Sequence, residues 1–306
     1  MVGVHWLVEG PRGRRLLWQL VEQRVGRLDP TAFERAVAHV VVEAGPWTEL
    51  ELLDACADSV TWARYWQGPD EIDLALTGAV DELGPVAELV EVPSWWLAPV
   101  ALDEQVVVTW QPPGPDLADA AGKLAAWREA TVADERRALS ERPTDREASW
   151  SGHWWSTPAM SGLPSTSREA AGLRLVEDSL GWSSAMVQPV DVRDGVRVFE
   201  VHRPEDWVLL VESHPLDVSA SRRHDWWRAV AAAEPLLIPD YVSVSQEWDA
   251  VHVSARGYLS TATRALPTDR GTTVLAGWNP DQTWWLTDAL RRAGDARQVA
   301  NPYGGT

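Results

Sequence analysis

The spacing of apolar residues changes halfway along the chain, and this change constrains the fold more than any other feature. In the first half, apolar side chains recur every three or four residues, which is the period of an amphipathic helix. After the polar stretch 140–150 they form short runs between turn residues. Helices and strands grouped without regular alternation predict an α+β fold. We expect a mostly helical region over 1–145, packed on a C-terminal antiparallel sheet with flanking helices over 146–306, and a ligand site at the boundary.

The helices of the first half should end where residues interrupt the helical pattern. Gly45-Pro46, Gly68-Pro69 and Gly84-Pro85 each predict such a break. One strand is expected over 104–110, around three consecutive valines. The helices themselves are expected over 13–26, 30–44, 48–66, 80–90 and 115–139.

A hairpin and a meander are the strands expected in the second half. Asp194-Gly195 is a dipeptide favoured in tight turns, so the flanking segments 186–192 and 196–202 are predicted to pair with each other. Turn residues, among them Gly257, separate the strands of the predicted antiparallel meander, which are 250–254, 258–266, 272–278 and 283–286. Helices are expected over 168–180, 204–213 and 221–232.

Tryptophan is far more frequent than the other aromatic residues, with 20 Trp against 4 Tyr and 2 Phe. A GC-rich bacterial coding sequence explains why Phe, Lys and Ile are scarce, but it does not explain the Trp count. Each indole can bury a large apolar area, while its N–H needs an acceptor. Two adjacent pairs, Trp154-Trp155 and Trp226-Trp227, have polar neighbours and are expected to line a pocket. Trp95-Trp96 and Trp284-Trp285 are expected in the core.

Charge and cysteine content narrow the class of protein. The formal charge is −18, which opposes binding to nucleic acid and to anionic membranes, so neither is an expected partner. Residues 1–150 carry 13 basic and 26 acidic side chains, against 14 and 19 in the remainder, so an anionic ligand is better tolerated in the second half. The N-terminal segment lacks the pattern of a signal peptide, and we expect a cytoplasmic protein. The single Cys56 is expected to be a small buried side chain and forms no internal disulfide.

Residues 219–228 are the most concentrated polar and aromatic segment. If Ser221 caps a helix, Arg222 and Arg223 lie in its first turn, where the helix dipole favours an anion over a cation. This placement predicts a bound or neighbouring carboxylate or phosphate. The two arginines are therefore candidate ligands for an anionic substituent, and the alternative is a structural patch of ion pairs with the acidic first half. The next residues, His224 and Asp225, are a candidate acid–base pair.

The predicted strand 250–254 carries the other candidate acid–base pair. It places His252 and Ser254 on one face, with Asp249 just upstream. A histidine that faces a cleft can transfer protons near neutral pH, and the alternative is a buried histidine satisfied by hydrogen bonds. None of the nearby serines lies in a nucleophile elbow, so a serine hydrolase is not indicated.

A metal site would need a third ligand. Glu200 and His202 share one face of their predicted strand and could approach one cation, with His214, His224 or His252 as a possible third ligand. No metal-binding motif supports the choice, and we expect no metal.

The loop 151–167 contains His153, Trp154 and Trp155 with several hydroxyl groups, which is typical of a segment that contacts a ligand. Indole faces attract cations and stack on flat rings. An aromatic or cationic small molecule is therefore the expected ligand.

The segment VHVSARGYLSTA, residues 251–262, resembles the His-bearing strand and the Ser-Thr strand of ADP-ribosyltransferase folds. The resemblance implies NAD as the substrate, with His252 beside the nicotinamide ribose and Tyr258 stacked on the nicotinamide ring. It also implies that Ser260-Thr261 brace the site. It covers about a dozen residues, and the family's catalytic glutamate has no matching position, Asp281 being only a stand-in.

Together these features predict a cytosolic enzyme that holds an aromatic or cationic small molecule in a Trp-lined cleft between the two regions. His252 or His224, supported by Asp249 or Asp225, would perform acid–base chemistry, and Arg222 with Arg223 would hold an anionic group. The alternative is a protein without catalytic activity, whose indoles bind a protein partner or a ligand. The sequence does not identify the reaction, the cofactor or the oligomeric state.

Overall fold

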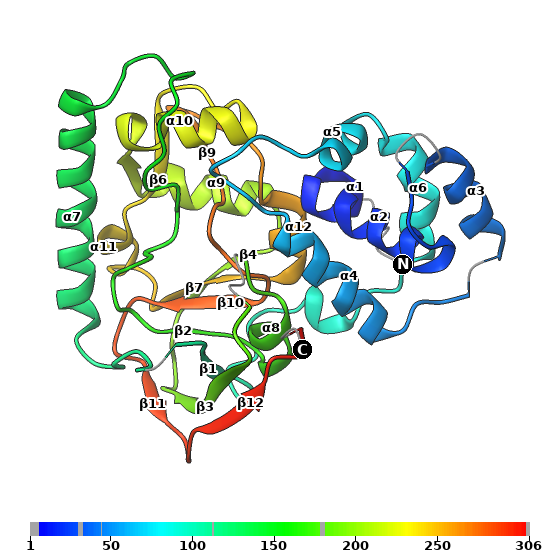
Figure 1. The fold of residues 1–306 in the computed structure, drawn as a ribbon. Coiled ribbons are helices and arrows are strands. Elements are labelled where there is room, and N and C mark those ends of the chain that lie inside the picture. The colour runs from blue at the N-terminus through cyan, green and yellow to red at the C-terminus, as the bar shows by residue number, and fades with distance from the viewer. Residues whose placement is uncertain (1–5, 30–32, 44, 112, 178–180, 304–306) are drawn as a thin grey trace.

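Helices from the first ninety residues pack side by side into one layer, which we call the helical layer (residues 6–89; Figure 1). The computed structural model describes residues 6–29, 33–43, 45–111, 113–177 and 181–303. The other residues form the body (residues 94–303). The helical layer contains α1 (Trp6–Glu9), α2 (Pro11–Val25), α3 (Phe33–Glu43), α4 (Glu49–Thr61), α5 (Glu71–Thr77) and α6 (Val80–Leu89).

The sequence pattern explains where most of these helices begin. Pro11 occupies the first turn of α2, where its missing N–H costs no hydrogen bond. Thr48 and Glu51 form a capping box at the start of α4. The break predicted at Gly84-Pro85 is wrong, because α6 continues through both residues to Leu89. The burial of neighbouring side chains, among them Leu83, outweighs the hydrogen bond that Pro85 cannot donate.

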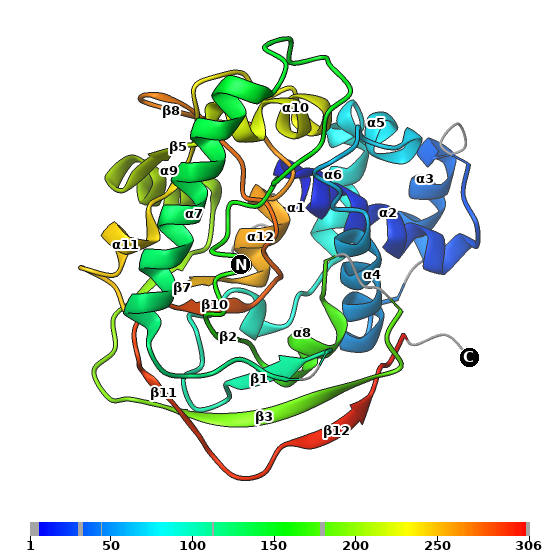
Figure 2. The same ribbon diagram turned by 60° about the vertical axis from the view of Figure 1, so that its left-hand side comes forward.

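The helices of the body surround its sheets. The short α12 (Ala255–Thr261) lies between the sheets and the helical layer and packs on α1 and α2. The long α7 (Ala120–Glu141) runs along the edge far from the helical layer (Figures 1 and 2). It packs on α10 (Ser219–Val230) and α11 (Tyr241–Val244). The remaining helical segments are the 3-10 turn Ser94–Trp96, α8 (Glu169–Arg174) and α9 (Pro204–Ser213).

In the described part of the chain the strands form three four-stranded sheets, and the fold is α+β as predicted. Most strand pairs are antiparallel, as predicted, but two of these sheets each contain one parallel pair. The first sheet contains β1 (Val106–Thr109), β3 (Ser184–Val192), β11 (Leu290–Arg292) and β12 (Arg297–Ala300), with β3 paired to the other three. The second has the order β2 (Ser165–Thr166), β10 (Gln282–Trp285), β7 (Ala250–Val253), β4 (Val198–Val201). The third has the order β5 (Pro215–Asp217), β6 (Leu236–Pro239), β9 (Gly271–Thr273), β8 (Leu266–Thr268).

The predicted hairpin does not form. Gly195 does adopt a turn conformation, with φ of +71°. The turn nevertheless leads from β3 in the first sheet to β4 in the second, where β4 pairs in parallel with β7. A local turn signal fixes the reversal of the chain but not the partner of the next strand.

Of the predicted meander, the antiparallel pair on either side of residues 269–270 forms, as β8 and β9. The first and last predicted strands, β7 and β10, pair directly with each other, antiparallel and with Thr283 opposite His252. The first part of the second predicted strand belongs instead to the helix α12. The Ser254 hydroxyl accepts a hydrogen bond from the Gly257 N–H and so caps the start of this helix. Ser260 and Thr261, expected in a strand from the resemblance to ADP-ribosyltransferases, therefore lie on a helix.

Tryptophans fill much of the interior. Those least exposed, each below 2 %, are Trp18, Trp96, Trp207, Trp226, Trp278 and Trp285. One member of each adjacent pair expected in the core, Trp96 and Trp285, is thus fully buried, while its neighbour is partly buried. Cys56 is buried and free, as predicted. No described helix combines the length and the apolar character needed to cross a membrane.

Candidate functional site

The helix that carries Arg222 and Arg223 begins at Ser219, two residues earlier than expected. The carboxylate of Glu135, on α7, accepts hydrogen bonds from the N–H groups of Ala220 and Ser221 at 2.7 and 2.8 Å. An anion does therefore lie at this helix end, and it belongs to the protein.

Both arginines bind groups of the protein. Arg222 donates from Nε to the Trp155 carbonyl at 3.3 Å and lies 3.8 Å from Asp134, and its burial lowers its pKa to about 10. Arg223 forms an ion pair with Glu234 and donates to the Pro143 carbonyl at 3.0 Å. These contacts engage both guanidiniums, so their role as an anion clamp for a ligand stays a prediction.

The predicted aromatic residues do come together, as a stack that joins the helical layer to α10. The ring of Trp154 lies 5.0 Å from that of Trp155 and 5.3 Å from that of Tyr65. The Trp154 carbonyl accepts a hydrogen bond of 2.8 Å from Nε1 of Trp226. Next to the stack, His153 is half exposed and lies 3.4 Å from Asp134. Trp227 instead faces Arg146, whose guanidinium lies 3.6 Å from the ring centroid.

His252 is fully buried on β7 between two carboxylates. Its Nδ1 lies 2.6 Å from Oε2 of Glu200, and its Nε2 lies 3.4 Å from Oδ1 of Asp281. Burial opposes a charged imidazole, but these carboxylates outweigh it and raise the pKa of His252 to about 9. His252 is therefore an imidazolium at neutral pH.

The expected carboxylate partners of the histidines are engaged elsewhere. Asp249 accepts hydrogen bonds from the Arg197 N–H, from Arg193 and from Thr287, each within 3.0 Å, and makes none with His252. His224 and Asp225 are both buried on α10. Burial lowers the pKa of His224 and raises that of Asp225, which accepts from the Gly152 N–H at 2.9 Å.

Sequence reasoning did not single out Glu177, a buried carboxyl at the contact between the helical layer and the body. Its Oε1 accepts hydrogen bonds from the hydroxyls of Tyr65 at 2.9 Å and Tyr258 at 2.6 Å. Its Oε2 is buried without a hydrogen-bond partner. Burial raises the pKa of Glu177 to about 8, so the group is mostly protonated at neutral pH. Tyr258, expected to stack on a ligand ring, instead supports this carboxyl.

The possible metal ligands are also engaged within the protein. Glu200 lies 3.6 Å from Nε2 of His202, whose Nδ1 lies 3.0 Å from the Ser254 hydroxyl. Within the described ranges, no group of three or more His, Cys, Asp or Glu side chains is arranged to hold a metal ion.

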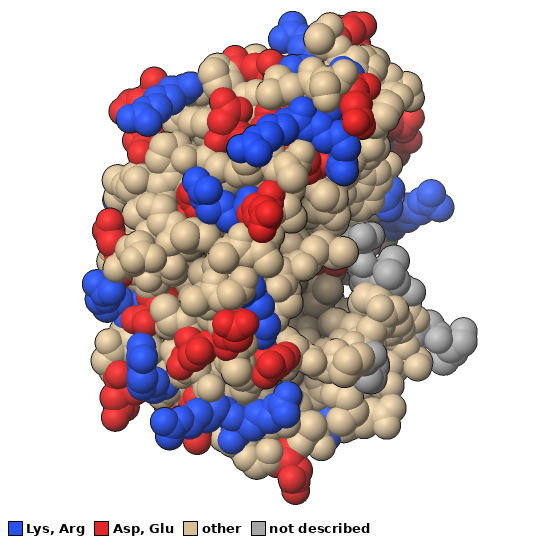
Figure 3. Space-filling model, turned by 90° about the vertical axis from the view of Figure 1, so that its left-hand side faces the viewer, with Lys and Arg blue, Asp and Glu red and all other residues tan. Residues whose placement is uncertain are grey.

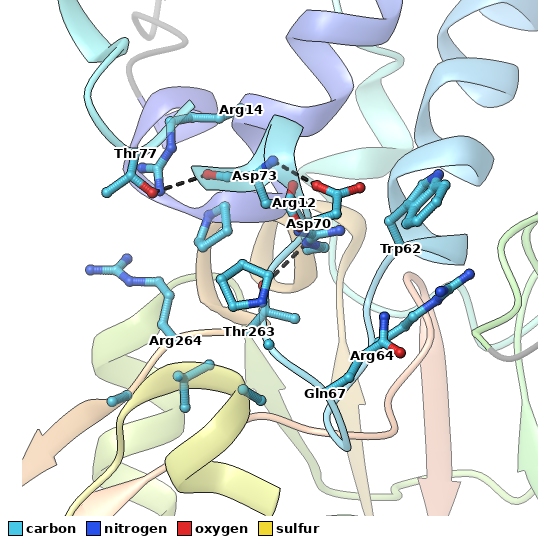
Figure 4. Close-up of a pocket in the computed structure, with 16 residues that line it drawn as sticks. Arg12, Arg14, Trp62, Arg64, Gln67, Asp70, Asp73, Thr77, Thr263 and Arg264 are labelled. Atoms are coloured by element: carbon cyan, nitrogen blue, oxygen red, sulfur yellow. Dashed lines mark hydrogen bonds and ion pairs between the residues drawn. The ribbon is translucent and has the colours of Figure 1, made fainter. Parts of the chain in front are cut away.

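A pocket of about 350 Å³ lies between the helical layer and the body (Figure 4). We call it the arginine pocket, and none of the candidate residues above lines it. From the helical layer it is lined by α2, α5 and the segment that joins α4 to α5, and from the body by the end of α10 and by residues 263–265. Its charged lining residues are Arg12, Arg14, Arg64, Asp70, Asp73 and Arg264.

Two aspartates neutralise the arginines on the inner side of this pocket. Arg12 forms an ion pair with Asp73 and donates from Nε to Thr263 at 3.1 Å. Arg15, which is buried behind the lining, donates to both carboxylate oxygens of Asp70 at 2.9 Å and lies 3.3 Å from Asp73. This inner group ties α2 to α5 and to residue 263 with balanced charges.

The other three arginines have no carboxylate partner among the residues that the structure describes. Arg14 donates to the carbonyls of Val8 and Glu9, and Arg264 donates to that of Ser260. The Arg64 guanidinium lies 4.5 Å from the ring centroid of Trp62. Burial and the nearby charge of Arg264 lower the pKa of Arg14, and the charge of Asp73 offsets this only in part. The pocket therefore has an excess of positive charge.

On the outer face of α7, in contrast to these three arginines of the pocket, arginines are paired with carboxylates. Basic and acidic side chains lie next to each other there (Figure 3). Arg128 lies 2.6 Å from Asp240, and Arg137 lies 2.6 Å from Asp134. Cations on this face are thus balanced by neighbouring carboxylates, whereas Arg14, Arg64 and Arg264 of the arginine pocket are not paired in this way within the described chain.

Comparison with known proteins adds no further constraint: the chain matches no family model, and no curated protein or solved structure is significantly similar to it.

Proposed function

We propose that this protein binds a small anionic molecule in the arginine pocket. The observation that carries the proposal is the set of three guanidiniums, those of Arg14, Arg64 and Arg264, that line one pocket without a carboxylate partner in the described chain. Guanidinium groups bind carboxylates and phosphates through parallel N–H donors. An anion between them would offset the repulsion by Arg264, which, after burial, is the second cause of the lowered pKa of Arg14.

The negative net charge of the protein makes the excess of positive charge in the arginine pocket unusual. A protein with a formal charge of −18 repels anions at long range, so an anion site requires a local cluster of cations. The pocket volume lies at the lower end of the range for small-molecule sites, which favours a small ligand over a polymer.

The position of the pocket predicts a structural effect of binding. Arg14 belongs to the helical layer and Arg264 to the body, so an anion that contacts both would hold the two parts together. Because a ligand stabilises only the folded state to which it binds, the midpoint of thermal unfolding should rise with its concentration.

The test is binding of simple anions to the purified chain. Calorimetry and thermal unfolding with inorganic phosphate, sulfate and malonate should detect binding by at least one of them. Arg264→Gln should weaken it by about tenfold, which corresponds to the loss of one charge-assisted hydrogen bond. Arg27→Gln is the matched control, because Arg27 is exposed and lies outside the pocket. No binding by any of the three anions would contradict the proposal.

The acid–base enzyme predicted from the sequence is a second proposal. It is supported by the contact of 2.6 Å between Nδ1 of His252 and Glu200, in which a carboxylate orients an imidazole. Its aromatic or cationic substrate would need access to a side chain that the fold buries completely. Loss of turnover in His252→Gln, with folding retained, would support it once a substrate is known.

A further inference from the structure

The arginine pocket has two unequal sides. Figure 4 shows Arg14 and Arg264 on one side, and Trp62, Arg64 and Gln67 on the other. The mutual proximity of the first two is also expressed in the lowered pKa of Arg14, for which Arg264 is the second cause after burial. One side of the pocket thus presents two guanidiniums to the same space.

Both guanidiniums are fixed by backbone carbonyls rather than by acids. Nη1 of Arg14 donates to the Val8 carbonyl at 2.8 Å, and Nη1 of Arg264 donates to the Ser260 carbonyl at 2.9 Å. These contacts hold the groups in place without neutralising them. Nε of Arg14 is moreover buried and has no hydrogen-bond partner among the described residues. A donor of this kind is costly unless a ligand accepts its hydrogen bond.

We infer that the anionic group bound on this side is a phosphate monoester in its dianionic form. The inference rests on the proposed function and specifies its ligand class. Two unneutralised guanidiniums match a charge of −2, and a phosphate monoester supplies nearly that charge at pH 7 on three acceptor oxygens. A carboxylate or a sulfate ester supplies only one negative charge. A dianion therefore gains more from this pair of arginines than a monoanion does.

The rest of the pocket limits what the phosphate can be attached to. Beyond these two arginines and the charged residues Arg12, Arg64, Asp70 and Asp73, the lining includes Thr263, Gln67, Pro69 and Val230. These last four side chains are uncharged and offer hydroxyl, amide and apolar contacts. In a pocket of about 350 Å³, they fit the phosphate ester of a small organic molecule rather than a phosphorylated protein or a lipid surface.

The test uses two probes that differ in charge but not in shape. Phenyl phosphate and phenyl sulfate carry the same ring, and benzoate is a carboxylate of similar size. Calorimetry at pH 7.5 should show phenyl phosphate binding at least about tenfold more tightly than the other two, since a dianion forms stronger charge-assisted hydrogen bonds with two guanidiniums than a monoanion does. A phosphoserine peptide should bind no more tightly than phenyl phosphate.

The pH dependence gives an independent readout. The second pKa of a phosphate ester is about 6, so its affinity should fall about tenfold between pH 7.5 and pH 5 as the dianion takes up a proton. The same measurement with phenyl sulfate, which does not titrate in this interval, corrects for the titration of the protein's own groups. The charged groups that face the ligand are Arg12, Arg14, Arg64, Asp70, Asp73 and Arg264.

Two variants locate the dianion. Arg14→Gln and Arg264→Gln should each lower the affinity for phenyl phosphate by about tenfold or more and reduce its preference over phenyl sulfate, while Arg27→Gln should leave both unchanged. Arg14→Lys keeps the charge without the planar fork and should retain part of the affinity. Far-ultraviolet circular dichroism checks folding.

The outcomes separate this inference from the proposed function. Equal affinity for phenyl phosphate and phenyl sulfate, or the same pH dependence for both, would overturn the dianion assignment while anion binding stood. Failure of every anion to bind would overturn both. A phosphopeptide that binds more tightly than phenyl phosphate would show that the ligand class is a phosphorylated protein.

Discussion

Tyr258 donates a hydrogen bond of 2.6 Å to Glu177 in the interior between the helical layer and the body, where that carboxyl is uncharged at neutral pH. Tyr65 donates to the same oxygen from the helical layer. A carboxylate there would have two hydroxyl donors for Oε1 and the more weakly placed backbone N–H of Gly277, while Oε2 is buried without a well-formed hydrogen bond from the described residues. These hydrogen bonds do not compensate for the loss of hydration around a full negative charge, so the carboxyl of Glu177 stays mostly protonated at neutral pH.

The raised pKa of Glu177 predicts that the protein loses stability as pH rises. In the unfolded chain this group loses its proton near pH 4.5, whereas in the folded protein it keeps it until about pH 8. The free energy of unfolding should therefore fall between these values, by an amount on the order of 4 kcal/mol from this group, and then level off. The glutamine of the Glu177→Gln variant cannot ionise. The free energy of unfolding of this variant, measured with urea at pH 5, 6, 7 and 8, should therefore not show this fall.

The control for this prediction is Glu88→Gln, since Glu88 is exposed on α6. It should reproduce the pH dependence of the unchanged protein. If Glu177→Gln also reproduces it, the carboxyl is ionised in the folded state and the prediction is wrong.

The charge of His252 should make the stability of the protein depend on pH. Its pKa is about 9 in the folded protein, against an ordinary value of 6.5, because the opposing effect of burial is outweighed by Asp281 and Glu200. The stabilisation is fully present below pH 6.5 and is lost as pH rises through 9. His252→Gln leaves two carboxylates without their cation, and we expect a loss of about 3 kcal/mol at pH 6 and a smaller loss at pH 9.5.

Denaturant unfolding at both pH values measures this difference. His202→Gln is the matched control: His202 is partly exposed and lies 3.6 Å from the same Glu200, so its loss should cost much less. A His252→Gln deficit of equal size at pH 6 and pH 9.5 would show that the imidazole contributes by packing and not by charge.

The helices could be predicted from the sequence because their determinants are local. The apolar period of α2 and the capping box at Thr48 act within a few residues of each other. Strand partners could not be predicted in the same way. Asp194-Gly195 marks a real turn, but β4 takes its place beside β7, about fifty residues further along the chain. That choice depends on packing across the whole body.

The candidate site also depends on tertiary contacts that a local sequence pattern does not predict. Arginines in the first turn of a helix oppose its dipole, and for this reason Arg222 and Arg223 are predicted to bind an anion. Arg12 and Arg14 lie in the same kind of position, because they follow Pro11 at the start of α2 with no acidic residue in that turn. The two helices differ in their tertiary contacts. Glu135 on α7 occupies the N-terminus of α10, whereas Arg14 lies near Arg264 and forms no ion pair with a carboxylate of the described chain.

Gly257 is predicted to be irreplaceable for a steric reason. A Cβ at this position would lie 2.0 Å from the carbonyl oxygen of Val201. That oxygen belongs to β4 and cannot move independently, so Gly257→Ala should shift α12 and cost about 3 kcal/mol of stability. Gly78→Ala, where nothing lies within 4 Å of the added carbon, should be nearly neutral. Chemical unfolding of both variants checks the comparison, and similar stabilities would contradict it.

The negative charge of Asp70 is expected to lower the affinity of the arginine pocket for anions. Its carboxylate neutralises Arg15, and its Oδ1 accepts the Asp73 N–H at 2.7 Å, which caps α5. Asparagine caps helices about as well as aspartate, so Asp70→Asn removes a negative charge from the pocket lining while keeping the cap. The electrostatic gain for a bound anion is roughly 1 kcal/mol, and calorimetry with phenyl phosphate should show about fivefold tighter binding. Asp103→Asn, an exposed change outside this pocket, should leave the affinity unchanged. Unchanged affinity in a folded Asp70→Asn protein would mean that the anion binds away from this carboxylate, and weaker binding would contradict the predicted electrostatic effect.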